Sequence, residues 1–224
     1  MAAPASAFYD YLFATADRDD EARPYRPPRI DDHDAPATTD TLATTLRSND
    51  DTAARAALET LFAATYPKLV RFALHYVSSQ DSAEDVVGDV FSSLWTHRAT
   101  LAPQGSLEAY LFGAVRRRAI STFRQWHRHA RQTPPVLADG EYWGMGVPPS
   151  APDADATEHD TNTVIWRAIA DLPERQREIL SLRWQAELGW DEIARVLEST
   201  SAAVQKQHSR AAITLRARLS SFLK

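Results

Sequence analysis

The chain has 224 residues, no cysteine and a formal net charge of −5, with 44% hydrophobic and 25% charged residues. This composition is typical of a globular protein of one or two domains, and the lack of cysteine excludes disulfide scaffolds, thiolate zinc sites and cysteine nucleophiles. The first residues lack a basic stretch followed by an apolar core, so we expect no secretory signal, no membrane insertion and a cytoplasmic location.

Residues 1–50 are rich in Asp, Pro and Thr, with DRDDEARPYRPPRIDDHDAP near their centre. A chain of this composition buries too little apolar surface to order itself, so we expect an acidic, disordered N-terminal extension. The aromatic cluster FYDYLF at 8–13 leaves a second interpretation open, in which the extension docks on a partner or masks a basic surface.

Two stretches with helical periodicity follow, at 51–131 and 162–224, and an acidic segment separates them. Residues 132–161 contain no Lys or Arg, six acidic side chains and two pairs of adjacent prolines, which is typical of a linker. We find neither an internal repeat nor an alternating run of strand length. The sequence therefore predicts an all-α protein, with two small helical domains joined by a flexible acidic linker.

The segment DSAEDVVGDVFSSLW at 81–95 predicts an amphipathic helix that begins near Ser82, with Asp81 and Glu84 in a capping arrangement. At about 100° per residue, its Val, Phe, Leu and Trp side chains share one face. The opposite face is polar and has two interpretations: a surface that is simply solvated, or a docking surface for a basic partner. It carries Asp85, Asp89 and Ser92.

The next helix is expected to begin near Ser106 and includes VRRRAISTFRQWHRHAR at 115–131. Its apolar side chains gather on one face, where Trp126 fits the core better than a base-stacking platform. Arg118 falls in this apolar arc and needs a carboxylate or a path to solvent. The other face has no acidic partner in its own helix and is typical of a contact with phosphates. It presents Arg117, Ser121, Arg124, Arg128 and Arg131.

The last stretch predicts a helix with Pro173 in its first turn, a short helix through Ile193, and a final helix with Thr200 as N-cap. This order is that of a helix-turn-helix, whose second helix enters the DNA major groove. His208 lies on the apolar stripe of that helix, so we favour a histidine in the core. The candidate DNA contacts on the outward face are Ala202, Gln205, Lys206, Ser209 and Arg210.

Arrangements typical of catalysis or metal binding are missing from the sequence. It has no glycine loop that would cradle a phosphate and no H-x-x-x-H spacing, and His127 and His129 point in different directions on a helix. We therefore expect no catalytic residue, no metal site and no cofactor, in a protein that is not an enzyme.

The order and spacing of these segments resemble the extracytoplasmic-function (ECF) sigma factors, the compact branch of the sigma-70 family that keeps regions 2 and 4. LFAATYPKLVRFALHYV resembles the start of region 2, and DSAEDVVGDVFSSLW is similar to the family segment D-x-A-E-D-x-x-Q-E-x-F-x-x-x-W. LEAYLFGAVRRRAISTFR resembles the segment that engages the −10 element. LPERQREILSLRW and the helix-turn-helix after it resemble region 4.

The resemblance implies an alternative sigma factor with region 2 at 51–131 and region 4 at 162–224, active in the bacterial cytoplasm and at the nucleoid. Its partners would be core RNA polymerase, docked on the helix of Asp85 and Asp89, and promoter DNA. The arginine helix and the loop THRATLAPQGS before it would capture the single-stranded −10 element, and the last helix would read the duplex −35 element. The linker would thread the polymerase cleft. The resemblance also allows an anti-sigma factor as a partner.

The chain departs from the family pattern at several DNA-facing positions. Arg117 and Ser121 stand where the family commonly has Asn and Asp, so the sequence does not determine which bases the −10 helix contacts. The helix-turn-helix has weaker phosphate attraction than usual, and we expect an unusual −35 preference. There, the turn glycine is replaced by Glu198, a buried aliphatic by Ser199, and the common basic pair by Gln205 and Gln207.

Two other functions remain open at this point. The first is a helix-turn-helix regulator that acts without replacing the sigma subunit, since 172–219 alone resembles the effector domain of such proteins. It would need neither the acidic face nor the arginine helix. The second is an interaction protein that binds no DNA, which would have no reason to contain a recognition helix.

Overall fold

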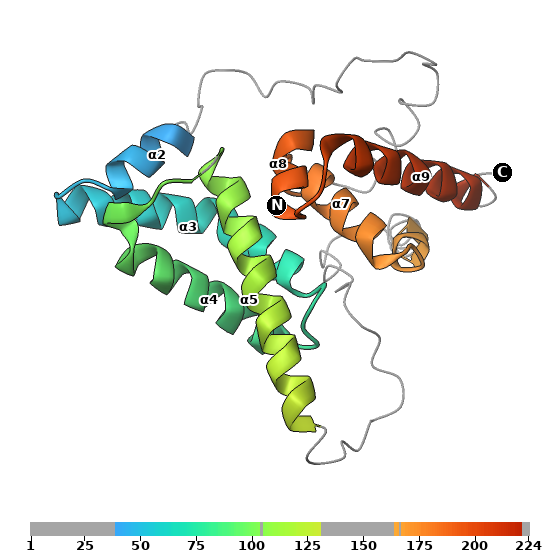
Figure 1. Cartoon of the computed structure of the whole chain (residues 1–224), viewed down its shortest axis with the longest axis horizontal. Helices are drawn as coiled ribbons and strands as arrows, with labels where there is room; N and C mark the ends of the chain where they lie inside the picture. The colour runs from blue at the N-terminus through green and yellow to red at the C-terminus, as the bar shows by residue number, and fades with distance from the viewer. Residues whose placement is uncertain (1–38, 104, 131–163, 166, 221–224) are drawn as a thin grey trace, which may run out of the picture.

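A computed structural model describes residues 39–103, 105–130, 164–165 and 167–220. Every regular element in these ranges is helical, as predicted, and the helices form two groups in contact (Figure 1). The N-terminal block contains α2 (Thr39–Leu46), α3 (Asp51–Ala73), α4 (Gln80–Thr96), the 3-10 helix η1 (Arg98–Thr100) and α5 (Leu107–Ala130). The C-terminal block contains α7 (Glu174–Trp184), α8 (Trp190–Val196) and α9 (Ser201–Leu219).

The N-terminal block packs α3, α4 and α5 around one apolar core. Helix α4 buries the face that its periodicity predicts, and Trp95 at its end is half-buried. Phe112 of α5, expected at the edge of the apolar face, is only 1% exposed and packs edge-on against Phe72 of α3. The side chains of α4 that were predicted on the apolar face and are buried are Val86, Val87, Val90, Phe91 and Leu94.

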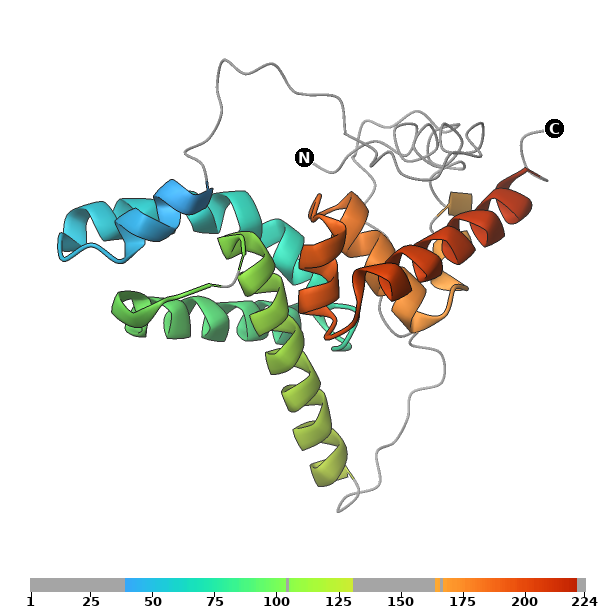
Figure 2. The same cartoon turned by 45° about the horizontal axis from the view of Figure 1, so that its top comes forward.

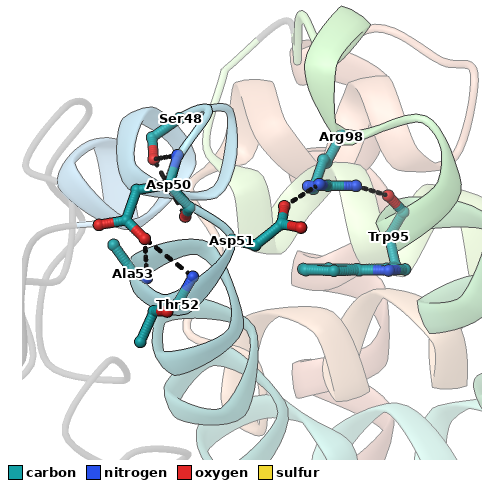
Figure 3. A network of polar contacts seen from close by, with 7 residues as sticks. All are labelled: Ser48, Asp50, Asp51, Thr52, Ala53, Trp95 and Arg98. Carbon is teal, nitrogen blue, oxygen red and sulfur yellow. Dashed lines mark hydrogen bonds and ion pairs between the residues drawn. The ribbon is translucent and has the colours of Figure 1, made fainter.

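Side-chain caps set where two of these helices begin. Asp50 Oδ1 accepts hydrogen bonds from the amides of Thr52 (2.9 Å) and Ala53 (3.2 Å), and so caps α3 (Figure 3). Helix α4 begins at Gln80 rather than near Ser82 as expected, because its N-cap is Ser79 and not Asp81. The hydroxyl of Ser79 accepts from the amide of Ser82 at 3.2 Å.

The expectation that residues 1–50 are disordered is wrong for residues 39–46, which form α2. Ala43 and Leu46, one helical turn apart, are 5% and 1% exposed and belong to the core of the N-terminal block. Arg47 Nη1 also donates to the carbonyl of Leu101 at 3.2 Å, which ties this end of the chain to the loop before α5. Residues 1–38, including the aromatic cluster at 8–13, lie outside the described residues.

The C-terminal block is the predicted helix-turn-helix with α7 packed behind it. Thr200 is the N-cap of α9, and its hydroxyl accepts from the amide of Ala203 at 3.2 Å. Glu198, which takes the place of the turn glycine, has a φ of 51°. The turn therefore keeps the left-handed backbone that glycine adopts without strain. The predicted stripe of α9 is buried at Val204, Ala211, Leu215 and Leu219.

The two blocks share a hydrophobic core. One continuous cluster of buried side chains includes Leu111 and Val115 of α5 together with Ile193 and Leu197 from α8 and its end. Figures 1 and 2 both place α8 beside α5. A second cluster lies within the C-terminal block, between the helical residues near 165–169, α7 and α9. Residues 132–161 lie outside the described ranges, so the flexible linker stays a prediction.

None of the described helices combines the length and the apolar character that crossing a bilayer requires.

His208 makes the stability of the C-terminal block depend on pH. It packs edge-on against Trp190 with ring centroids 5.0 Å apart, and burial lowers its pKa to about 4, with Arg183 and Arg216 acting in the same direction. Between pH 6.5 and about 4, the imidazole of His208 is therefore protonated in the unfolded chain and neutral in the folded chain. We expect acidification through this window to remove about 3 kcal/mol of stability, which neutral pH restores.

The measurement is urea unfolding at pH 7.5 and pH 4.5 for the parent protein and for His208→Gln. Other groups also titrate, so the two proteins are compared by the unfolding free energy that each loses between pH 7.5 and pH 4.5. The parent protein should lose more than His208→Gln. Equal losses would show that His208 accepts a proton in the folded state.

Candidate functional site

The acidic face of α4 is exposed, as its sequence pattern predicts. Asp85, Asp89 and Ser92 all lie on the solvent side of the helix, opposite the apolar face that packs on α3 and α5. Asp85 makes no ion pair among those the structure gives for the described residues. This face can therefore offer negative charge and a hydroxyl to a basic surface.

Asp89 also has a partner within the protein. Arg118 of α5 donates to Asp89 Oδ2 from Nε at 3.0 Å and from Nη2 at 2.5 Å. Arg118 was expected to find a carboxylate or to reach solvent, and it does both, with the carboxylate coming from the neighbouring helix. Both side chains are about half exposed, at 48% and 53%, so the pair contributes at most about 1 kcal/mol and can be exchanged for another contact.

The arginine face of α5 borders a cleft between the two blocks. Arg117, Ser121 and Arg124 are exposed and line a cavity of about 660 Å³, to which Glu198 of the C-terminal block also contributes. The side chains of Trp126 and Arg128 lie outside the described residues, as does Arg131. The structure thus brings three of the predicted phosphate-binding residues together on a rigid helix.

Sequence reasoning missed the role of Arg116, which lies between the apolar and the polar faces of α5. Its Nε is 3.5 Å from Glu178 of α7, and its side chain is 17% exposed. Glu178 also pairs with Arg175 at 3.2 Å and accepts a hydrogen bond from the hydroxyl of Tyr76. The sequence signal was a glutamate on the inward side of an amphipathic helix, but periodicity does not reveal a partner in another block.

A shelf made of Trp95, Arg98 and Asp51 holds the start of the loop between α4 and α5 (Figure 3). The guanidinium of Arg98 lies 4.0 Å from the centroid of the Trp95 ring, and its Nη1 donates to the Trp95 carbonyl at 3.3 Å. Its Nη2 donates to Asp51 Oδ1 at 2.5 Å. These contacts fix the backbone at the point where the chain leaves α4 and turns toward α5.

The five predicted DNA contacts of α9 are all exposed, while the stripe on the other side of the helix is buried. The exposed set is Ala202, Gln205, Lys206, Ser209 and Arg210. Gln207, one of the two glutamines that replace the basic pair, is half-buried and accepts a hydrogen bond from Gln176 of α7 at 3.4 Å. It therefore contributes to packing behind the recognition helix, and Gln205 faces solvent.

Among the described residues, no three His, Asp or Glu side chains gather in a way that could hold a metal ion. The exposed candidate residues are cations on α5, carboxylates on α4, and amides with small side chains on α9. Their chemistry is that of binding surfaces.

Two family models match this chain. One described as Sigma-70 region 2 matches residues 61–129, and one described as Sigma-70, region 4 matches residues 163–215. The ECF RNA polymerase sigma factor RpoE of Cereibacter sphaeroides is 32% identical over 156 residues, which are 68% of this chain and 79% of the relative. The RNA polymerase sigma factor FliA of Pseudomonas aeruginosa is 48% identical over 52 residues, 23% of this chain and 21% of that protein.

Two solved structures share the fold. A chain in the co-crystal structure of the sigma factor RpoE with the anti-sigma factor NepR from Bartonella quintana matches with a TM-score of 0.56 and 21% identity, over 72% of this chain and 96% of that one. The structure of CnrH in complex with the cytosolic domain of CnrY matches with a TM-score of 0.53 and 20% identity, over 83% of this chain and 99% of that one.

The shelf under the loop depends on the flat guanidinium of Arg98. Arg98→Lys keeps the positive charge but loses the stacking on Trp95 and the forked hydrogen bonds. We expect a loss of about 1 kcal/mol in the free energy of unfolding by urea, with faster amide exchange in the loop between α4 and α5.

Arg55→Lys is the matched control, since the guanidinium of Arg55 lies 5.8 Å from the centroid of the same ring and its side chain is exposed. This control should cost less than about 0.5 kcal/mol and leave the loop protected. An equal cost for the two variants would contradict the role of the shelf.

Proposed function

This chain belongs to the ECF branch of the sigma-70 family, and we propose that it is an alternative sigma factor that directs core RNA polymerase to the promoters of a specific regulon. The observation that carries this proposal is the presence, in one chain, of three exposed surfaces with different chemistry. They are the acidic face of α4, the arginine face of α5 and the recognition face of α9.

We assign the N-terminal block to region 2 and the C-terminal block to region 4. Region 2 was expected at 51–131, and the packing of α2 on α3 supports a start near Thr39. Region 4 was expected at 162–224, and the linker at 132–161 would join the two in the polymerase cleft. As in the family, binding rather than catalysis is the expected contribution of this subunit.

The acidic face of α4 is the proposed docking surface for core polymerase. Asp85, Asp89 and Ser92 are presented by a helix whose other side is anchored in the core, so their geometry is fixed before the partner arrives. Preformed charge of one sign favours a partner surface of the opposite sign and speeds encounter with it. Arg118 would release Asp89 when a cation of the polymerase takes its place.

Promoter DNA is the proposed partner of the other two surfaces. Arg117, Ser121, Arg124 and Arg128 of α5, with the loop before it, would hold the unpaired −10 strand, because cationic grooves follow a single-stranded backbone. The exposed residues of α9 would read the −35 duplex in the major groove, where Gln pairs with adenine and Lys with guanine or phosphate.

A helix-turn-helix regulator that leaves the sigma subunit in place is not favoured, because the match to region 2 covers the block that such a regulator does not need. An anti-sigma factor is a further proposed partner. The two similar solved chains come from complexes with NepR and with the cytosolic domain of CnrY, which supports this proposal. We place the active protein in the cytoplasm at the nucleoid.

Reversing the charge of the α4 face should separate the protein from polymerase. Asp85→Arg with Asp89→Arg places two cations against a basic partner, so we expect copurification with core enzyme to disappear while the helical circular dichroism stays unchanged. Like charges across an interface cost several kcal/mol, whereas exposed substitutions change stability by about 0.5 kcal/mol.

The control is Glu84→Arg, which makes one such charge reversal on the same helix, about 100° around from Asp85. This variant should still copurify. Retention of core enzyme by the double variant would mean that α4 is not the docking surface.

Reversing the arginine face should block promoter melting without blocking recruitment. Arg117→Glu with Arg124→Glu changes two exposed residues, so we expect the protein to fold and to bind core polymerase. Each lost phosphate contact lowers the salt dependence of single-strand binding by about 0.7 in log–log slope. Permanganate footprinting should then show unreactive −10 thymines.

Lys206→Glu is the control for this experiment, because it reverses an exposed charge on the recognition helix α9 instead of on α5. This variant should weaken binding to the −35 duplex and leave binding to the −10 single strand unchanged. Normal melting by the α5 variant, at normal salt dependence, would assign the arginines to another partner.

A further inference from the structure

Helix α2 lies before the segment that the region 2 family model matches, yet it is built into the base of a loop inside that segment. The match begins at residue 61, whereas α2 ends at Leu46. Ala43 and Leu46 belong to the buried cluster that also contains Leu101 and Leu107, at the two ends of the loop between η1 and α5. Helix α2 accordingly packs on both α3 and α5. The support of this loop therefore includes α2.

Arg47, the residue that follows α2, fixes the first peptide of the loop. Its Nη1 donates to the carbonyl of Leu101 at 3.2 Å, and its Nη2 lies 3.5 Å from the hydroxyl of Thr44. The amide of Leu101 donates to the carbonyl of Arg98 at 3.2 Å, and the Leu101 side chain is 7% exposed. Leu101 is thus held by three parts of the block: its carbonyl by Arg47, its amide by η1 and its side chain by the core.

Two arginines clamp the chain where it enters the loop. Arg98 reaches from η1 to Asp51, the first residue of α3, and Arg47 reaches from the end of α2 to the loop backbone (Figure 3 shows the first of these contacts). At the other end of the loop, the hydroxyl of Ser106 accepts from the amide of Ala109 at 3.2 Å as α5 begins. The loop is therefore fixed at both ends.

The part of the loop after Leu101 follows the direction that its peptide sets. The structure describes residues 101–103 and 105–106 of the loop, and Ala102 and Gly105 are exposed. Pro103 has a fixed φ and restricts Ala102 to an extended conformation. Because neither residue can turn freely to compensate, a rotation of the peptide between Leu101 and Ala102 displaces the backbone that follows. A ligand of the exposed loop is then sensitive to a hydrogen bond that it does not touch.

We propose that Arg47 is a positioning residue for the loop that captures the −10 strand, and that its bond to the Leu101 carbonyl sets which unpaired base the loop accepts. The proposal rests on the proposed function, because it concerns the same DNA-binding loop. Arg47 acts through the backbone and does not need to touch DNA.

Arg47 is exposed, so its charge offers a rival role as a direct phosphate contact. The two roles change different quantities. A phosphate contact contributes affinity and salt dependence without reading the sequence, whereas the position of a base-reading loop determines base preference.

The test compares base selection by holoenzyme, formed from the full chain and core polymerase, on a single-stranded DNA library of random sequence. Sequencing of the bound strands gives the enrichment of each base at each position of the selected motif. Arg47→Met keeps the aliphatic stem and removes the donors. We expect this variant to lower the enrichment of the preferred base at one position by at least about fivefold, the lower end of what one base contact contributes. The salt dependence of binding should stay unchanged.

Arg47→Lys is the conservative variant, because its ammonium can still donate to the Leu101 carbonyl. It should restore most of the enrichment. Arg55→Met is the matched control, since it removes the same charge from an exposed arginine of α3 whose guanidinium lies over Trp95. This control should select the same bases as the parent.

Two further measurements separate positioning from a loss of stability. Val87→Ala removes buried atoms from α4 about two and a half turns before the helix ends, and should lower the urea midpoint without changing base preference. Amide hydrogen exchange in the loop between η1 and α5 should be faster in Arg47→Met and unchanged in Val87→Ala. Equal changes of base preference in these two variants would show that Arg47 only supports the fold, and would overturn the proposal.

Selection of the same bases by the parent and by Arg47→Met would also overturn it. If that result came with a salt slope lower by about 0.7, Arg47 would be assigned to a phosphate instead. A parent holoenzyme that selects no bases at all would contradict the proposed function and this inference with it. A parent that selects bases, beside an Arg47→Met variant that selects the same ones, contradicts the inference alone.

Discussion

The arrangement of the whole molecule depends on one helix, α5, which must serve three surfaces at once. Its 24 residues turn through about 100° each, so an apolar face, a cationic face and an intermediate line run along it side by side. The apolar face, with Leu111 and Val115, closes the core of the N-terminal block. The cationic face, with Arg117 and Arg124, is open to solvent, and the line between them carries Arg116 to Glu178.

The distribution of charge follows from this division. The chain as a whole is acidic, with a net charge of −5, and general attraction to nucleic acid is therefore weak. Positive charge is concentrated on α5, and several of its arginines have an acidic neighbour. Arg118 meets Asp89, Arg116 meets Glu178, and the exposed arginines share a cleft with Glu198. The Arg118–Asp89 pair is about half exposed, so a charged partner can replace either member, whereas the Arg116–Glu178 pair is buried between the blocks.

The sequence was sufficient for the helices and their faces, since burial of one side of a helix leaves a period that can be read directly. The buried residues of α4 and the stripe of α9 follow this rule, and the cap at Thr200 follows from the preference for hydroxyl side chains at the N-cap. Helix α2 was missed because the average composition of fifty residues concealed one short apolar turn at Ala43 and Leu46. The contact between the two blocks could not be predicted, because it depends on shape and on pairs such as Tyr76 with Glu178 that have no local pattern.

Helix α8 shows how much of the fold depends on contact between the two blocks. It has seven residues, too few to be stable without tertiary packing, and it packs on both α5 and α9. Ile193 and Leu197, at its centre and its end, are at most 2% exposed and share a buried cluster with Leu111 of α5. The helix-turn-helix therefore draws part of its stability from α5, the same helix that carries the exposed arginines.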